Sequence, residues 1–101
     1  MATEVNDNPD DARYEITVDG TLAGFAQYRE MGGTRVFTHT EVFKEFGGQG
    51  LGTVLVRGVL ADVRRSEGRL VALCPFVDRY IGENQEWADL VDPELDIRLR
   101  D

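Results

Sequence analysis

Cysteine, histidine and tryptophan each occur only once in this chain, and no run of eighteen apolar residues is present. A single cysteine, Cys74, excludes an intrachain disulfide and favours a reducing compartment, so we expect a cytoplasmic protein. A transmembrane helix needs about 20 consecutive apolar residues, and a secretory leader needs an apolar segment that the acidic residues 1–11 do not provide. We therefore expect neither export nor a membrane partner.

Basic residues are also scarce: 11 lysines and arginines stand against 19 aspartates and glutamates, for a net charge of −8. Proteins that bind nucleic acid neutralise its phosphates with a basic face. The only local positive cluster in this sequence is formed by Arg57, Arg64, Arg65 and Arg69. Four arginines can serve one phosphorylated ligand or form the solvated face of a helix. We expect no nucleic-acid partner.

The length and composition indicate one globular domain with a small core, because 42% of the 101 residues are hydrophobic and 30% are charged. We predict a monomer or a weak homodimer. The polar, turn-rich residues 1–12 and the acidic residues 92–101 predict flexible tails. The folded domain is expected to span residues 13–91.

Alternating apolar residues predict an antiparallel meander at the start of this domain. Two strands are expected over residues 14–18 and 22–28, joined by a tight turn at Asp19-Gly20. After a further turn at residues 31–34, the β-branched residues 36–42 predict a third strand.

The second half of the domain changes character, because the apolar period becomes 3.6 from Leu51 onward. This predicts a helix that ends at a C′ glycine, Gly68. The apolar run 70–73 is then expected to form a fourth strand parallel to the third, through a right-handed crossover. A second, interrupted helix over residues 76–90 is expected on the opposite face. The predicted class is α/β, more closely α+β, with a mixed, mostly antiparallel sheet and helices on both faces.

A glycine-rich turn, Phe46-Gly47-Gly48-Gln49-Gly50-Leu51-Gly52, precedes the first predicted helix. Glycine lets successive N–H groups point at a ligand, and the first N–H groups of a helix are unpaired and carry its positive dipole end. The turn is therefore a candidate pyrophosphate site, or else a tight connector. Thr53 and Leu55 stand where a dinucleotide fingerprint needs glycine, and the Gly-Lys-Ser/Thr of a P-loop is missing, so the sequence excludes both of these motifs.

Several blocks of this sequence resemble the GNAT superfamily of N-acetyltransferases. Gly50 and Gly52 match its Arg/Gln-x-x-Gly-x-Gly/Ala motif, in which Gly47 takes the place of the usual Arg or Gln. A subfamily of small, single-domain acetyl-CoA-binding GNAT-like proteins is more similar, through residues 37–42, 48–52 and 73–77, followed by 80–81 and 87–91. The resemblance covers residues 14–91 and implies a minimal GNAT fold with a βαβ unit that binds the cofactor.

The resemblance also implies how acetyl-CoA, or coenzyme A itself, would be held. The pyrophosphate would rest on the glycine-rich turn, and the pantetheine arm would lie like an added strand in a gap between the third and fourth strands. Gly47 removes a side chain that helps to frame the pyrophosphate, so weaker affinity than is usual in the family is expected. No metal site is predicted. The expected cofactor-binding residues are Val42, Phe43, Gly47, Gly48, Gln49, Gly50, Leu51, Gly52 and Thr53.

Four side chains are candidates for the chemistry of acetyl transfer. The resemblance implies Tyr80 as the acid that protonates the departing thiolate. His39 and Glu41 project from one face of the predicted third strand and are candidate bases. Cys74 is a candidate acceptor of the acetyl group if a neighbour lowers its pKa. A packing role within the core or the sheet is the alternative for Tyr80, His39 and Cys74.

These features predict an acetyl-CoA-binding, N-acetyltransferase-like protein that transfers an acetyl group to an unidentified amine. The alternatives are a non-catalytic sensor or carrier of acyl-CoA and a purely structural interaction domain. Full-length GNAT enzymes carry further helices after the first strand and further strands at the C-terminus, which form the acceptor site. This sequence lacks them, so an acceptor groove that is short, open or completed by a partner is expected.

Overall fold

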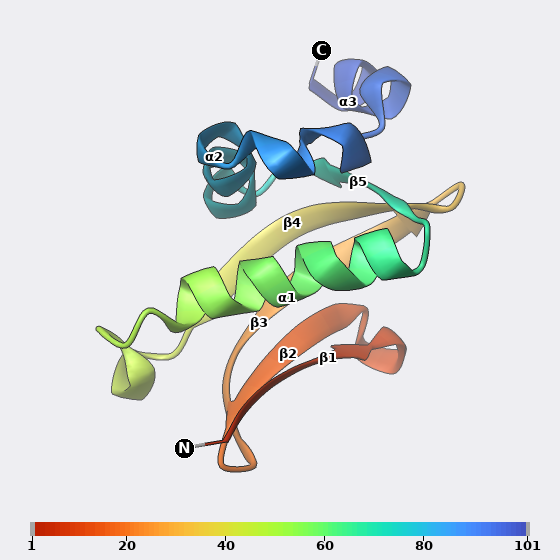
Figure 1. The fold of residues 1–101 in the computed structure, drawn as a ribbon. Coiled ribbons are helices and arrows are strands. Elements are labelled where there is room, and N and C mark those ends of the chain that lie inside the picture. The colour runs from red at the N-terminus through yellow and green to blue at the C-terminus, as the bar shows by residue number, and fades with distance from the viewer. Residues whose placement is uncertain (1, 101) are drawn as a thin grey trace.

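A five-stranded sheet forms the centre of the molecule in the computed structural model, which describes residues 2–100 (Figure 1). The strands follow the order β1-β2-β3-β4-β5, and all neighbours are antiparallel except β4 and β5, which are parallel. The mixed, mostly antiparallel sheet predicted from the sequence is confirmed. The strands are β1 (Thr3–Asn8), β2 (Arg13–Val18), β3 (Thr21–Met31), β4 (Thr34–Val42) and β5 (Arg69–Ala72).

The two hairpins turn at the predicted positions. Asp19 and Gly20 have φ angles of 50° and 84°, and Gly32 and Gly33 have φ angles of 59° and 85°. Two consecutive residues with positive φ match the right-handed twist of the flanking strands, which is why Asp-Gly and Gly-Gly pairs favour such turns. The meander of β2, β3 and β4 therefore follows directly from local sequence.

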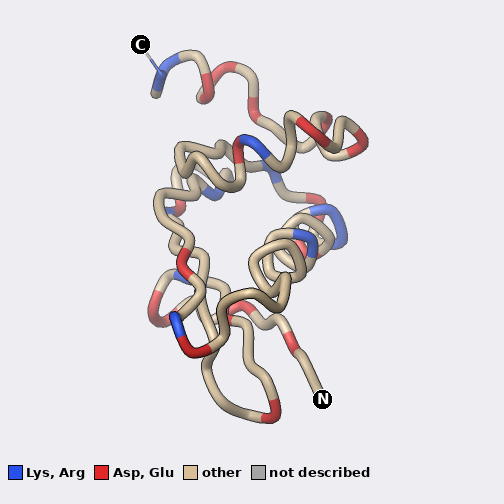
Figure 2. Tube along the Cα trace, turned by 90° about the vertical axis from the view of Figure 1, so that its left-hand side faces the viewer, with Lys and Arg blue, Asp and Glu red and all other residues tan. Residues whose placement is uncertain are grey.

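The helix α1 (Leu51–Arg65) lies along one face of the sheet and carries the chain from β4 to β5 (Figure 1). Figure 2 views α1 almost end-on, with the curled sheet beside it. The buried side of α1 consists of Leu51, Leu55, Val56, Val59, Leu60 and Val63, as the 3.6-residue period predicts. The sequence predicted Gly68 as the C′ residue, but Glu67, one residue earlier, takes this position. Glu67 adopts the left-handed conformation with φ of 57°, and the Gly68 N–H then donates to the Val63 carbonyl at 2.9 Å.

The second predicted helix is interrupted as expected, into α2 (Pro75–Glu83) and the 3₁₀ helix η3 (Gln85–Leu90). Its expected position on the opposite face is wrong, because α2 and η3 pack beside α1. The Phe76 ring lies against Gly52, and Arg64 of α1 binds the Asp89 carboxylate at 2.8 Å. Val77 and Ile81 share one continuous apolar core with α1, so burial of their side chains draws α2 to that side.

Within residues 2–100, both terminal segments form secondary structure where the composition predicts flexible tails. Residues 3–8 form the edge strand β1, which pairs with β2 along its whole length, from Thr3 opposite Val18 to Asn8 opposite Arg13. Residues Pro93–Arg100 form α3, which is held to β5 by a 2.7 Å hydrogen bond from Arg100 to the Ala72 carbonyl. Backbone pairing is available to polar sequences, so a polar composition does not exclude a strand. Within residues 2–100, no helix is both long and apolar enough to span a membrane.

The close packing of β1 on α1 depends on the small size of Gly58. Substitution of this glycine therefore tests the position of the edge strand β1. A Cβ atom at Gly58 would lie 2.8 Å from Cβ of Val5, whereas one at Gly82 in α2 would meet nothing within 4 Å. Gly82→Ala is therefore expected to raise the free energy of unfolding by about 0.5 kcal/mol through helix propensity. Gly58→Ala is expected to lower it by about 1 kcal/mol, because β1 must shift to relieve the overlap.

Chemical denaturation measures both changes, and amide hydrogen exchange of β1 locates the second. The docking is wrong if Gly58→Ala stabilises the protein as much as Gly82→Ala does, or if the amides of residues 3–8 exchange as fast as those of an unstructured peptide.

Candidate functional site

The glycine-rich turn presents backbone donors that no side chain of the turn uses. Gly48 and Gly50 have φ angles of 78° and 72°, which favour glycine over residues with a Cβ. The N-cap residue of α1 is Gly50. Because glycine has no side chain, the N-cap position offers no acceptor to the first N–H groups of the helix. Together with the helix dipole, these donors make the turn a candidate site for an anion.

A pocket of about 440 Å³ opens at this turn and extends to β4 and α2. Most of the predicted cofactor-binding residues lie on its wall, while Gln49 and Phe43 do not. Three further wall residues, Thr40, Phe46 and Phe76, were missed by the sequence analysis. The full lining is Thr40, Val42, Phe46, Gly47, Gly48, Gly50, Leu51, Gly52, Thr53 and Phe76.

The free edge of β4 forms the inner wall of this pocket. The last residue pair between β4 and β5 joins Phe37 to Ala72, and the Phe37 carbonyl accepts hydrogen bonds from both Leu73 (2.9 Å) and Cys74 (3.0 Å). The chain then leaves β4 to enter α2, whereas β4 continues to Val42. Among the described residues 2–100, none forms a strand beside residues 38–42 on this side, which is the gap that the sequence analysis expected.

The direction of the backbone groups along this edge follows from one hydrogen bond. The Phe43 N–H donates to the Ala23 carbonyl of β3 at 2.8 Å. Because alternate residues of a strand point their N–H and C=O groups to opposite sides, those of Val42 and Thr40 point into the gap. The structure thus brings Val42 to the site but directs Phe43 away from it, with its ring 6.1 Å from that of Phe25.

Cys74 lies directly behind the pocket wall. It is the N-cap residue of α2, is only 4% exposed, and its thiol donates a hydrogen bond to the Thr40 hydroxyl with an Sγ–Oγ1 distance of 3.3 Å. Since Thr40 lines the pocket, its hydroxyl lies between the Cys74 thiol and the cavity. The structure places Cys74 beside the gap, as the sequence predicted.

His39 and Glu41 lie close together but outside the pocket. Their side chains contact each other through Nε2 and Oε1 at 3.2 Å, and they are 56% and 49% exposed. Thr40 and Val42 line the pocket, so the alternation of β4 directs His39 and Glu41 to the other face of the sheet. The two faces of the sheet meet at the free edge of β4. A ligand in the gap could therefore reach His39 and Glu41 only around this edge.

Tyr80 also lies outside the pocket wall. Its hydroxyl accepts a hydrogen bond from Nε of Arg57 in α1 at 3.4 Å. Phe76, one helical turn earlier in α2, is the residue that lines the pocket. The spacing i, i+4 could have indicated Phe76 from the sequence, because residues one turn apart share a helix face.

Comparison with known proteins decides the family. The sequence model described as GCN5-related N-acetyl-transferase matches residues 13–90. The chain belongs to this family. The GNAT fold predicted from the sequence is thereby confirmed, and membership of this family supports acetyl transfer as the general class of chemistry. No curated protein matches the chain significantly.

Two solved structures of GNAT-type proteins resemble the chain. A GCN5-like protein from Staphylococcus aureus has 22% sequence identity and a TM-score of 0.65, with 88% of this chain and 87% of that chain covered. A GNAT-family protein from Desulfovibrio desulfuricans has 33% identity and a TM-score of 0.51 over 59% of this chain. The match spans only 40% of the Desulfovibrio protein, so this chain corresponds to less than half of that larger GNAT protein.

Proposed function

We propose that this protein binds acetyl-CoA and transfers its acetyl group to an amine. The observation that carries the proposal is the pocket itself, which joins the uncapped N-terminus of α1 to the free edge of β4. An anion site beside an unpaired strand edge suits a ligand with a pyrophosphate at one end and an amide-containing arm at the other. The family supports acetyl-CoA as the acyl donor.

The residues present fit this donor. The amides of residues 48–53 would hold the pyrophosphate, and the backbone of Thr40 and Val42 would pair with the pantetheine amides. Phe46 and Phe76 provide apolar walls on either side. Gly52 permits the close approach of Phe76, because a Cβ atom there would lie 2.9 Å from Cζ of that ring.

The reaction proposed is acyl transfer between a thioester and an amine. A bond forms between the amine nitrogen and the acetyl carbon, the bond from that carbon to sulfur breaks, the amine loses a proton and the thiolate gains one. His39 and Glu41 are the proposed bases, and Tyr80 is the proposed acid. Cys74 offers a second route, in which its sulfur accepts the acetyl group and the CoA thiol is released before the amine attacks.

The acceptor is proposed to approach across the face of β2, β3 and β4 that lies opposite α1. Within the described residues, α1 is the only α-helix with substantial contacts to β2 and β3, so their other face is open. Phe25, Phe43 and His39 lie side by side there, with ring centroids 5.8 to 6.1 Å apart. Cytoplasmic location and a monomer or weak homodimer remain predictions.

Titration calorimetry with acetyl-CoA and CoA, followed by an assay of CoA release with a panel of primary amines, tests the proposal. Binding with amine-dependent turnover supports the enzyme. Binding with a stable acetyl label on Cys74, absent in Cys74→Ser, indicates a carrier, and binding with neither indicates a sensor. The proposal fails if millimolar acetyl-CoA and CoA produce no binding heat.

Gly47 gives a gain-of-affinity prediction at the same site. Its φ and ψ of −67° and 154° suit any residue, and a Cβ atom would meet only the Lys44 carbonyl oxygen at 3.3 Å. Gly47→Arg is expected to tighten CoA binding about tenfold, because a guanidinium can form a bidentate contact with a phosphate. Gly47→Ala is the control and is expected to change the dissociation constant less than about twofold. Equal affinities for the two variants would contradict the placement of the pyrophosphate.

A further inference from the structure

Two arginines beside the pocket form no ion pair with any residue from 2 to 100, although the chain carries a net charge of −8. In the arginine cluster noted in the sequence, Arg64 binds Asp89 and Arg65 binds Asp62. Arg57 contacts only the Tyr80 hydroxyl within residues 2–100. Arg79 of α2 is exposed and makes no ion pair or side-chain hydrogen bond within the same range.

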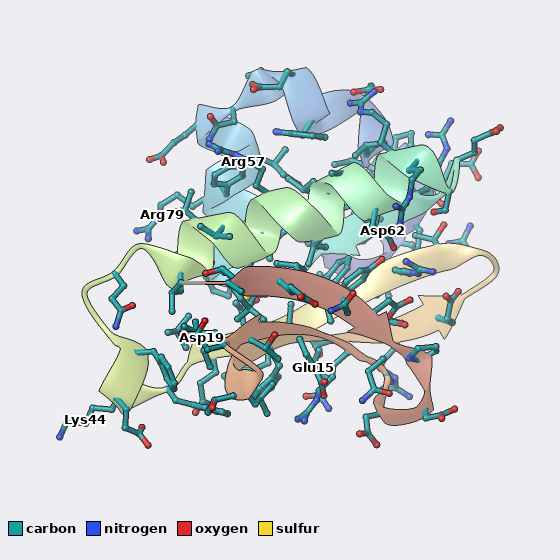
Figure 3. All side chains as sticks on the ribbon, turned by 60° about the horizontal axis from the view of Figure 1, so that its bottom comes forward. Glu15, Asp19, Lys44, Arg57, Asp62 and Arg79 are labelled. Carbon is teal, nitrogen blue, oxygen red and sulfur yellow. The ribbon has the colours of Figure 1, made fainter. Side chains whose placement is uncertain are left out.

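Both arginines lie one helical turn beyond the pocket, on its two opposite walls. Arg57 follows Thr53 of α1 by four residues, and Arg79 follows Phe76 of α2 by three. Residues with these spacings share a helix face. The contact between Arg57 and Tyr80 shows that α1 and α2 remain adjacent at this level. Figure 3 shows Arg57 and Arg79 at the same end of the helix pair, with Asp62 farther along α1.

Glu86 is near enough to act on the charge of Arg57 but forms no ion pair with it within residues 2–100. Cations that lack an ion-pair partner attract an anion. Four residues of α-helix span about 6 Å, so Arg57 lies about that far along α1 from Thr53, the last residue whose amide is assigned to the pyrophosphate. A phosphate held beside Arg57 would be joined to the pyrophosphate at the glycine-rich turn by a linker about as long as one ribose. Coenzyme A carries such a phosphate, the 3′-phosphate of its ribose.

We propose that Arg57 and Arg79 form a second anion site that binds the ribose 3′-phosphate of coenzyme A and selects it over dephospho-CoA. This inference rests on the proposed function, because it needs the pyrophosphate to occupy the glycine-rich turn. Arg57 is held in place by Tyr80, and Arg79 closes the site from α2. Tyr80 then serves as a positioning residue for Arg57, and this role is an alternative to that of the acid, because the 3′-phosphate and the thioester lie at opposite ends of coenzyme A.

The test compares CoA with dephospho-CoA, which lacks only this phosphate. Calorimetric dissociation constants are measured for the wild-type chain and for the double variant Arg57→Gln, Arg79→Gln. The matched control is Arg29→Gln, Arg98→Gln, which changes the net charge equally. Arg29 and Arg98 are exposed and, within residues 2–100, have no ion pair or side-chain hydrogen bond; Arg29 lies on β3 and Arg98 on α3, outside the pocket lining. Circular dichroism confirms that each variant is folded.

The wild type is expected to bind CoA about tenfold more tightly than dephospho-CoA, since a charged hydrogen bond contributes about this factor at an exposed site. The ratio should fall below about threefold in Arg57→Gln, Arg79→Gln, remain tenfold in the control, and decrease at high salt. Equal wild-type affinities for the two ligands overturn this inference and leave the proposed function standing. A tenfold ratio that survives in the double variant assigns the phosphate to other residues and also overturns it. If neither ligand binds, both the inference and the proposed function fail.

Discussion

Phe37→Ala is expected to lower the free energy of unfolding by about 3 to 5 kcal/mol, the range found when a buried aromatic ring is removed. Phe37 is completely buried in β4, and its ring packs against Tyr14 and Tyr28 with centroid distances of 6.0 and 5.7 Å. The ring sits where β4 still pairs with β5, immediately before the gap. A loss of this size is a large share of the total stability of a small domain, about 5 to 15 kcal/mol.

Urea denaturation of Phe37→Ala and Thr38→Ala measures this effect. Thr38 is the exposed neighbour of Phe37, and its truncation is expected to cost less than about 1 kcal/mol. Phe37→Ala should also raise the dissociation constant for CoA, because the cavity left by the ring lies beneath the gap between β4 and β5. Similar destabilisation by the two variants would show that Phe37 does not belong to the core as described.

Arg35→Met is expected to lower the free energy of unfolding by about 2 to 3 kcal/mol, because it leaves carboxylates and the Tyr14 hydroxyl without their shared cation. Arg35 is only 22% exposed, lies 3.6 Å from the carboxylates of both Asp7 and Asp62, and stacks on the rings of Tyr14 and Tyr28 at 5.5 and 5.3 Å. This cluster joins β1, β2, β3 and β4 to α1. Arg29→Met on β3 is the matched control, because Arg29 is exposed, and a change below about 0.5 kcal/mol is expected.

The same cluster predicts how stability depends on pH. Burial tends to raise the pKa of Asp62, but hydrogen bonds from Tyr14 and Arg65 and the charges of Arg65 and Arg35 outweigh it and hold this pKa below its usual value. A lowered folded-state pKa stabilises the protein above the unfolded-state pKa of about 4, and this stabilisation is lost as the pH falls through the folded-state value. Burial and the hydrogen bond to Asp7 raise the pKa of Tyr28 to about 12.

The stabilisation linked to Tyr28 is therefore complete below pH 10 and is lost as the pH rises towards 12. Denaturation midpoints measured from pH 2 to 12 are expected to fall at both extremes. Asp62→Asn should make the fall of the midpoint at acid pH shallower. Tyr28→Phe should make the fall at alkaline pH shallower. An unchanged fall at acid pH in Asp62→Asn would contradict the role given to that carboxylate.

Local sequence was sufficient for the meander, for α1 and for the glycine-rich turn. Asp19-Gly20 and Gly32-Gly33 require positive φ angles that few other residues adopt, and the apolar stripe of α1 leaves one choice for its buried side. The polar strand β1 gave no comparable signal, because its stability comes from backbone pairing with β2 and from the small size of Gly58.

The candidate site divides in the same way. Gly48, Gly50 and Gly52 were predicted because close backbone approach and a free helix N-terminus are properties of local sequence. Phe76 and Thr40 were missed, since they reach the pocket from α2 and β4 through packing between distant segments. Phe43 was also predicted, although the sequence gave no information on which edge of the strand its N–H would face. This N–H donates to the Ala23 carbonyl, on the side away from the gap.

The sequence by itself determined the family, the glycine-rich turn and the order of the elements from β2 to η3, because each of these depends on residues that are neighbours in the chain. Only the tertiary structure decided that α2 packs beside α1, that β1 and α3 are ordered, and that His39 and Glu41 face away from the pocket. Only the tertiary structure, too, left Arg57 and Arg79 without an ion pair among residues 2–100, on the two helices that flank the pocket. Which charges are paired depends on contacts between segments far apart in sequence, and those contacts are set by the burial of apolar side chains in a common core.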